Sequence, residues 1–142
     1  MKKIALFLMV AAMIGLVSCK EDTTYEDGSY KAEAADYHYG WKAFMNVTID
    51  GDEQTVVTFD YTNEDGALKT ETTQEDYNMT PHPSVWCPEI ESQLMSVDIL
   101  NYAGIDGITG ATGGSSDADA LFALILDAAL EGDKTTQILA AE

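Results

Sequence analysis

The chain has 142 residues, with 25 acidic side chains against seven lysines and no arginine, so its formal net charge is −18. This length corresponds to one domain. A chain so acidic would repel a phosphate backbone, which excludes nucleic acid as an expected partner, and anionic lipid surfaces would repel it in the same way.

The first 18 residues have the pattern of a signal peptide. Lys2 and Lys3 precede an uncharged apolar run over residues 4–17, which is shorter than the roughly 20 residues of a membrane-spanning helix and has the length of a signal-peptide core. The run ends in LVSC, which resembles a lipobox, so we expect Cys19 to be lipidated and to become the new N-terminus. The alternative is an ordinary cleavage site with an unrelated cysteine.

Removal of the signal peptide makes the chain more acidic still. Lys2 and Lys3 leave with it, so five lysines remain against all 25 acidic residues and the formal charge becomes −20. Because charge repels this chain from anionic lipid, its membrane residence would depend on the acyl chains of Cys19. We therefore expect a lipid-anchored protein of the cell envelope that faces away from the cytoplasm.

The mature chain divides into a tether, a domain and a tail. Residues 19–26 are polar and acidic without periodicity and predict a tether. The domain is expected over residues 27–133, followed by a C-terminal tail over residues 134–142. Residues 44–49 and 54–61 alternate in polarity like strands. A hairpin signal separates them at residues 50–53, and a turn at residues 63–66 leads into a short third strand at residues 67–70.

Helices are predicted in the second half. Residues 72–84 form a long polar loop, which is unusual for a connection and suggests a segment that covers a site. Pro88 suits the first position of the next helix, whose apolar stripe consists of Ile90, Leu94 and Val97. The last helix is expected to begin at Ser116, paired with Asp119 in a capping box, and to end at Gly132. The expected fold class is α+β, with an antiparallel sheet packed against two C-terminal helices.

The segment DGITGATGGSS, residues 106–116, carries the strongest chemical signal. Its four glycines permit tight turns and close approach of a ligand, and a helix N-terminus follows, which favours an anion. The glycine spacing matches neither a P-loop, which also needs a lysine, nor a dinucleotide fingerprint. The alternative interpretation is a turn that only caps the last helix.

This segment resembles the flavinylation motif of the FMN-binding domain family. The family includes flavin-carrying components of the sodium-pumping NADH:quinone reductase and of the Rnf complex, together with small FMN-binding lipoproteins. The resemblance covers residues 27–132; Asp106 matches the motif aspartate and Thr112 the acceptor of the flavin. The cofactor-binding set that it implies is Asp106, Gly107, Thr109, Gly110, Ala111, Thr112 and Gly113. Gly113 and Gly114 stand where relatives have larger residues, which we expect to loosen the loop.

The resemblance implies a covalent cofactor. In the family, a flavin transferase uses FAD and magnesium to place FMN on the acceptor hydroxyl, so Thr112 would become a phosphothreonyl-FMN. The protein would then relay electrons between a membrane donor or reductase and a downstream acceptor, as a carrier rather than an independent enzyme. Residues expected to contact the isoalloxazine ring are the aromatic side chains Trp41, Tyr61, Tyr77 and Trp86 and the polar side chains Lys69 and Asn78.

Other chemistry has little support in the sequence. His38, His82 and Cys87 lack a recognised metal-ligand spacing, so no metal is expected, and no nucleophile elbow of a hydrolase is present. Cys87 is interpreted as a buried thiol, with a redox role beside the flavin as the alternative. Two other functions stay open: a cofactor-free surface lipoprotein that acts as an interaction module, and a flavin-dependent reductase with its own substrate.

Overall fold

The computed structural model describes residues 22–141. A four-stranded sheet has the order β3-β2-β1-β4 and two long helices pack on it, so the predicted α+β class is confirmed. The elements follow the chain as β1 (Gly28–Ala34), β2 (Lys42–Asp50), β3 (Glu53–Thr62), η1 (Lys69–Glu71), α2 (Pro83–Ser96), η2 (Ile99–Asn101), α3 (Thr112–Glu131) and β4 (Gln137–Leu139). No helix among the described residues is long and apolar enough to cross a membrane.

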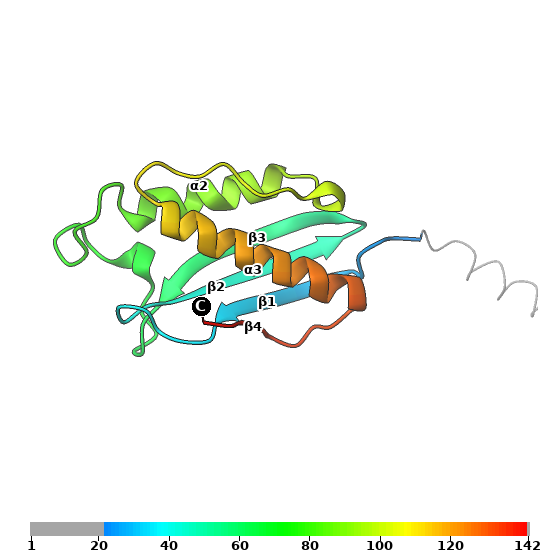
Figure 1. The fold of residues 1–142 in the computed structure, drawn as a ribbon, viewed down its shortest axis with the longest axis horizontal. Helices are drawn as coiled ribbons and strands as arrows, with labels where there is room; N and C mark the ends of the chain where they lie inside the picture. Colours follow the sequence, from blue (N-terminus) through cyan, green and yellow to red (C-terminus); the bar gives the residue numbers. More distant parts are fainter. Residues whose placement is uncertain (1–21, 142) are drawn as a thin grey trace, which may run out of the picture.

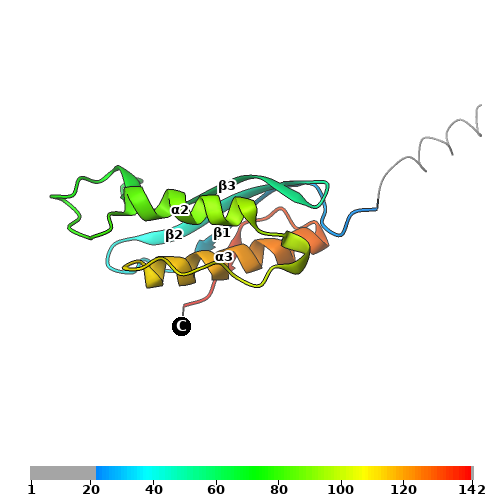
Figure 2. The ribbon, with the colours of Figure 1, turned by 90° about the horizontal axis from the view of Figure 1, so that it is seen from above.

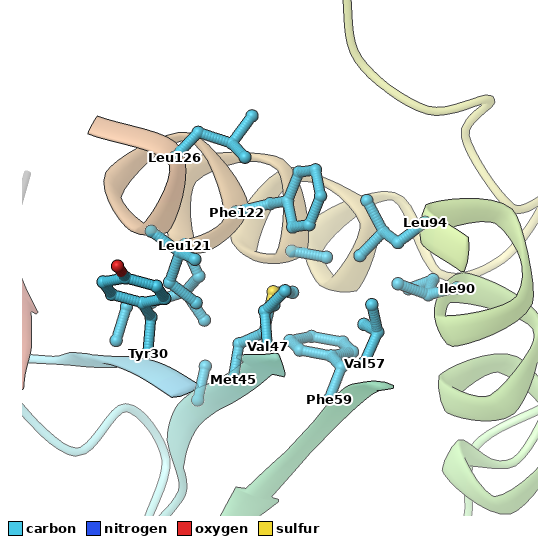
Figure 3. Packing of buried hydrophobic residues seen from close by; sticks show 14 of the residues in the cluster. Tyr30, Met45, Val47, Val57, Phe59, Ile90, Leu94, Leu121, Phe122 and Leu126 are labelled. Atoms are coloured by element: carbon cyan, nitrogen blue, oxygen red, sulfur yellow. The ribbon is translucent and has the colours of Figure 1, made fainter. Parts of the chain in front are cut away.

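Both helices lie on the same face of the sheet. Helix α3 crosses β1 and β2, while α2 runs along β3 (Figures 1 and 2). The strands turn alternate side chains toward the helices, because successive residues of a strand point to opposite faces. Figure 3 shows the resulting core, in which apolar side chains of both helices meet those of the sheet: Tyr30, Met45, Val47, Val57, Phe59, Ile90, Leu94, Leu121, Phe122 and Leu126.

The predicted hairpin is present between β2 and β3. Its two loop residues, Gly51 and Asp52, have φ angles of 60° and 62°. Positive φ at both positions is the requirement of the two-residue turn whose twist matches the flanking strands. The predicted third strand is wrong: residues 69–71 form the short helix η1, and only an isolated bridge from Leu68 to Thr62 continues the sheet there.

Helix α2 begins earlier than predicted. Pro83, not Pro88, occupies its first turn, where the missing N–H costs no hydrogen bond. His82 caps the helix, with its Nδ1 accepting a hydrogen bond from the Ser84 N–H at 3.2 Å. Pro88 lies inside the helix, and Val97 follows its end instead of belonging to the apolar stripe.

Helix α3 also begins earlier, at Thr112 rather than after Ser116. The predicted capping box does not form, because Asp119 accepts hydrogen bonds from the Tyr102 hydroxyl and the Ile105 N–H instead. The C-terminal cap is as predicted: Gly132 is left-handed, with φ 69°, and its N–H bonds to carbonyls of the last turn.

Both ends of the described chain belong to the domain. Tyr25 is buried and the Glu26 N–H donates to the Ala129 carbonyl at 2.9 Å, so residues 25 and 26 are part of the domain and not of the predicted tether. The predicted tail contains β4, which pairs in parallel with β1; next to it the Ala35 N–H donates to the Leu139 carbonyl at 2.9 Å. The predicted signal peptide and Cys19 lie outside the described residues.

Candidate functional site

A cavity of about 300 Å³ lies at the end of the domain where α3 begins. The loop between β1 and β2, the loop before α2 and the start of α3 all gather at this end (Figure 1). Segments far apart in the sequence therefore contribute to one wall. The lining residues are Ala34, Asp36, His38, Tyr39, Trp41, Ala43, Tyr61, Lys69, Tyr77, Met79, Trp86, Gly110, Ala111, Thr112, Gly113, Gly114 and Asp117.

The predicted motif divides between the cavity and its surroundings. Gly110, Ala111, Thr112 and Gly113 line the cavity, but Asp106, Gly107 and Thr109 do not. Asp106 borders a different hollow, which it shares with the end of α2. The motif aspartate and the predicted acceptor therefore line different hollows.

The start of α3 presents unbonded donors to the cavity. Thr112 is the exposed first residue of the helix, and its N-cap residue Ala111 makes no side-chain capping bond. The first N–H groups of a helix have no partner within it. Among the described residues, no side chain accepts from the N–H of Thr112, Gly113 or Gly114. With no acidic residue in this first turn, the helix dipole here favours an anion.

Two glycines of the motif are required by close packing. Gly110 has φ 85°, and a Cβ there would lie 2.7 Å from Cδ of Pro81. A Cβ at Gly114 would lie 2.4 Å from the ring of Trp86. The expectation that Gly113 and Gly114 loosen the loop is therefore wrong for Gly114, which admits the indole against the helix, whereas a Cβ on Gly113 would meet open space.

Aromatic side chains form the opposite wall. All four rings predicted to contact a flavin line the cavity: Trp41, Tyr61, Tyr77 and Trp86. Tyr61 meets Trp86 edge to face with 6.0 Å between ring centroids, and its hydroxyl donates to Oδ2 of Asp117 at 2.6 Å. Burial, and then the Asp117 carboxylate, raise the pKa of Tyr61 above its usual range. This bond joins the aromatic wall to α3.

Lys69 stands among these rings as a cation without a carboxylate partner. Its ammonium lies 4.3 Å from the ring centroid of Tyr61, 4.6 Å from that of Tyr77 and 5.8 Å from that of Trp41. The residue is 9% exposed. A desolvated cation over an aromatic face gains about 2 kcal/mol, so the rings hold the buried charge in place.

Asn78 is not brought to the site. It is exposed, does not line the cavity, and accepts a hydrogen bond from the Gln74 amide at 3.3 Å.

Two residues that line the cavity, His38 and Tyr39, were not predicted from the sequence as part of the site. Tyr39 is 91% exposed, with φ 52°. The aromatic-rich run YHYGW, residues 37–41, could have indicated that these residues belong to the site. Backbone hydrogen bonds between His38 and Trp41 close this run into a tight loop.

Two buried groups, the indole of Trp86 and the thiol of Cys87, belong to adjacent residues of α2. The Trp86 indole Nε1 is buried without a hydrogen-bond partner among the described residues, which is uncommon for a buried donor. Cys87 is fully buried and does not line the cavity. Burial, followed by Asp60 and Glu91, raises the pKa of the Cys87 thiol above its usual range, so Cys87 is placed as a buried thiol. Within residues 22–141 no group of three His, Cys, Asp or Glu side chains could hold a metal.

Known proteins resemble this chain along most of its length. No protein-family model matches it. A 15 kDa lipoprotein of Treponema pallidum (strain Nichols) is 29% identical over 132 residues, covering 89% of this chain and 90% of the relative. The crystal structure of the CPE2226 protein from Clostridium perfringens superposes with a TM-score of 0.75 at 27% identity, covering 83% of this chain and 99% of the other. The fold of the whole domain is therefore one that a solved structure shares.

Proposed function

We propose that the chain is an exported lipoprotein that carries FMN covalently on Thr112 and relays electrons. One observation carries the proposal: an exposed threonine at the start of α3 opens onto a cavity walled by Trp41, Tyr61, Tyr77 and Trp86. These four residues come from segments far apart in the chain. A hydroxyl acceptor beside aromatic faces matches the two parts of FMN, its phosphate and its ring.

The size and chemistry of the cavity support this assignment. Ligand sites have volumes of about 300 to 1,000 Å³ and are mostly apolar with a few polar groups, and this cavity of about 300 Å³ is at the lower end. The aromatic wall offers faces and edges against which a planar ring packs. When bound, FMN would supply one- and two-electron transfer, which no side chain of this cavity provides.

The residues around Thr112 would hold the phosphate end. The N–H groups of Gly113 and Gly114 are free to donate to a phosphoester. The space beside Gly113 leaves room for it, since a Cβ there would meet nothing within 4 Å. A chain with a charge of −20 would hold a free anionic flavin poorly. A covalent bond removes that difficulty, and it prevents loss of the cofactor outside the cell.

The lipid anchor is proposed at Cys19. The relative in Treponema pallidum is named a lipoprotein, and the LVSC sequence resembles a lipobox. Maturation would require signal cleavage and acylation, followed by a flavin transferase that uses FAD. The electron donor would be a membrane redox partner or reductase, and the acceptor would lie outside the cytoplasm.

The test is intact-mass analysis after co-expression with a flavin transferase. We expect the wild-type chain to gain the mass of FMN less water, Thr112→Ser to gain it as well, and Thr112→Val to gain none. Thr136→Val is the control, because Thr136 is an exposed threonine that lies outside the motif and does not line the cavity. Attachment that persists in Thr112→Val, or that disappears in Thr136→Val alone, would refute the assignment. A wild-type chain without flavin would favour a cofactor-free interaction module.

A further inference from the structure

Lys69 differs from every other lysine that the structure describes. Residues 22–141 contain four lysines, and three of them pair with carboxylates at 3.3 to 3.4 Å. Lys31 and Lys42 pair with Glu33, and Lys134 pairs with Glu26. Lys69 is the most buried of the four and has no carboxylate within 4.0 Å among these residues. In so acidic a chain, a buried cation left without an anion is a specific feature of this cavity.

The surroundings of Lys69 stabilise the charge only in part. A buried charge needs a partner or strong hydrogen bonds, and the faces of Tyr61, Tyr77 and Trp41 offer a weaker attraction than a carboxylate. Because Lys69 lies on the wall of the cavity, negative charge that develops inside would be stabilised by it. The low dielectric around a buried lysine strengthens this effect compared with a lysine in water.

The carboxylates of the cavity wall have the opposite effect to Lys69, because they destabilise negative charge that develops inside the cavity. Asp36 and Asp117 also line the cavity. With Lys69 removed, the lining would contain two carboxylates and no lysine or arginine. A group that becomes more negative on accepting electrons would then be harder to reduce. Lys69 is therefore the only lysine or arginine of this lining that opposes the acidic field around it.

We infer that Lys69 raises the reduction potential of the flavin held in this cavity, an inference that rests on the proposed function. At neutral pH full reduction adds two electrons and one proton from solvent to the ring, so the ring gains one negative charge. The ammonium of Lys69 is a fixed positive charge on the cavity wall, and charge beside the ring is one of the means by which a protein tunes a flavin. Lys69 thus positions charge, and it takes no part in bond formation.

The test is a redox titration of the flavinylated protein with dithionite, which supplies the electrons and is oxidised to sulfite. Intact mass first establishes that each variant carries FMN. We expect Lys69→Met to lower the equilibrium constant for reduction about tenfold, a shift of about 30 mV for a two-electron couple. Lys69→Arg, which keeps the charge, should restore most of the wild-type potential. Lys31→Met removes a half-exposed lysine on β1 and changes the net charge equally; its potential should equal that of the wild type.

Each other outcome contradicts the inference in a distinguishable way. If Lys69→Met carries flavin at the wild-type potential, or if Lys31→Met lowers the potential as much, the inference fails while the proposed function stands. If the wild-type chain carries no flavin, both fail. Lys69→Gln is a second neutral variant, used if Lys69→Met does not fold by circular dichroism. If both neutral variants fold without attaching flavin while Lys69→Arg attaches it, Lys69 serves attachment and the inference is wrong.

Discussion

The two glycines at the start of α3 form a matched pair for testing the packing of the site. Gly113 and Gly114 are neighbours in the first turn of the same helix, and neither requires a positive φ. A Cβ on Gly113 would meet nothing within 4 Å, whereas one on Gly114 would lie 2.4, 2.7 and 3.1 Å from three atoms of the Trp86 ring. The same substitution, to alanine, should therefore have opposite effects at the two positions.

The magnitudes follow from helix propensity and overpacking. Alanine for glycine stabilises a helix by up to about 1 kcal/mol, so Gly113→Ala should raise the free energy of unfolding by a few tenths to about 1 kcal/mol. Gly114→Ala receives the same gain but forces Trp86 to move. Trp86 is 2% exposed and packs against Phe59 and Tyr61, so the cost of overpacking, about 1 to 3 kcal/mol, should dominate.

Thermal and urea unfolding of the chain from Lys20 onward, followed by circular dichroism, measures the difference. We expect Gly113→Ala to exceed Gly114→Ala in unfolding free energy by about 2 kcal/mol, or by about 8 °C in Tm at about 4 °C per kcal/mol. Tryptophan fluorescence should change in Gly114→Ala only, because only this substitution displaces the indole of Trp86. Equal stabilities for the two variants would refute the placement of Trp86 against the start of α3.

Two further predictions concern Cys87, which is buried, and Glu91, which is half-buried. Cys87 should not react with a thiol reagent at pH 8 in the folded protein and should react fully in guanidinium, because burial raises the pKa of its thiol and excludes the reagent; rapid labelling of the folded chain would contradict this. Burial also raises the pKa of Glu91 above its ordinary value of 4.5. A raised carboxyl pKa stabilises the fold below that ordinary value, and the stability is lost as the pH rises through the folded value. Glu91→Gln keeps an acceptor for the Phe59 N–H and should be more stable than the wild type at pH 7 but not at pH 4, as measured by urea unfolding; an equal difference at both pH values would show that ionisation of Glu91 is not the cause.

Local patterns predicted the elements whose causes are local. The alternation of β2 and β3 and the turn at Gly51 and Asp52 depend on neighbouring residues, and both are present. The start of α3 was predicted wrongly because Ser116 and Asp119 have the spacing of a capping box, while Asp119 bonds to the distant Tyr102. Strand β4 was missed because three residues are too few to show a period, and its partner β1 lies about 100 residues earlier.

The candidate site shows the same division. Thr112 was predicted as a site residue from its motif, and the four aromatic residues were predicted as ring contacts from their chemistry alone. Their meeting around Lys69 depends on the order of the strands, which has no local signal, and on the path of the loop before α2, of which the sequence indicated only the length and polarity. Asp106 shows the converse, since the motif names it but the path of the chain carries it to a different hollow.

The position of the chain's entry relative to the cavity bears on the electron donor that we propose. The Glu26 N–H bonds to the carbonyl of Ala129, near the C-terminal end of α3, while Thr112 begins that helix. The 17 residues between Thr112 and Ala129 correspond to about 26 Å along the axis. From Cys19 to Thr24 the chain can extend at most about 18 Å. If Cys19 carries the lipid, the chain enters the domain from its anchor beside the C-terminal end of α3, and the cavity lies at the opposite end of that helix. If Thr112 also carries a flavin, we expect a membrane donor to reach it most directly when the redox group of that donor stands above the bilayer surface, at a height of up to roughly the length of α3.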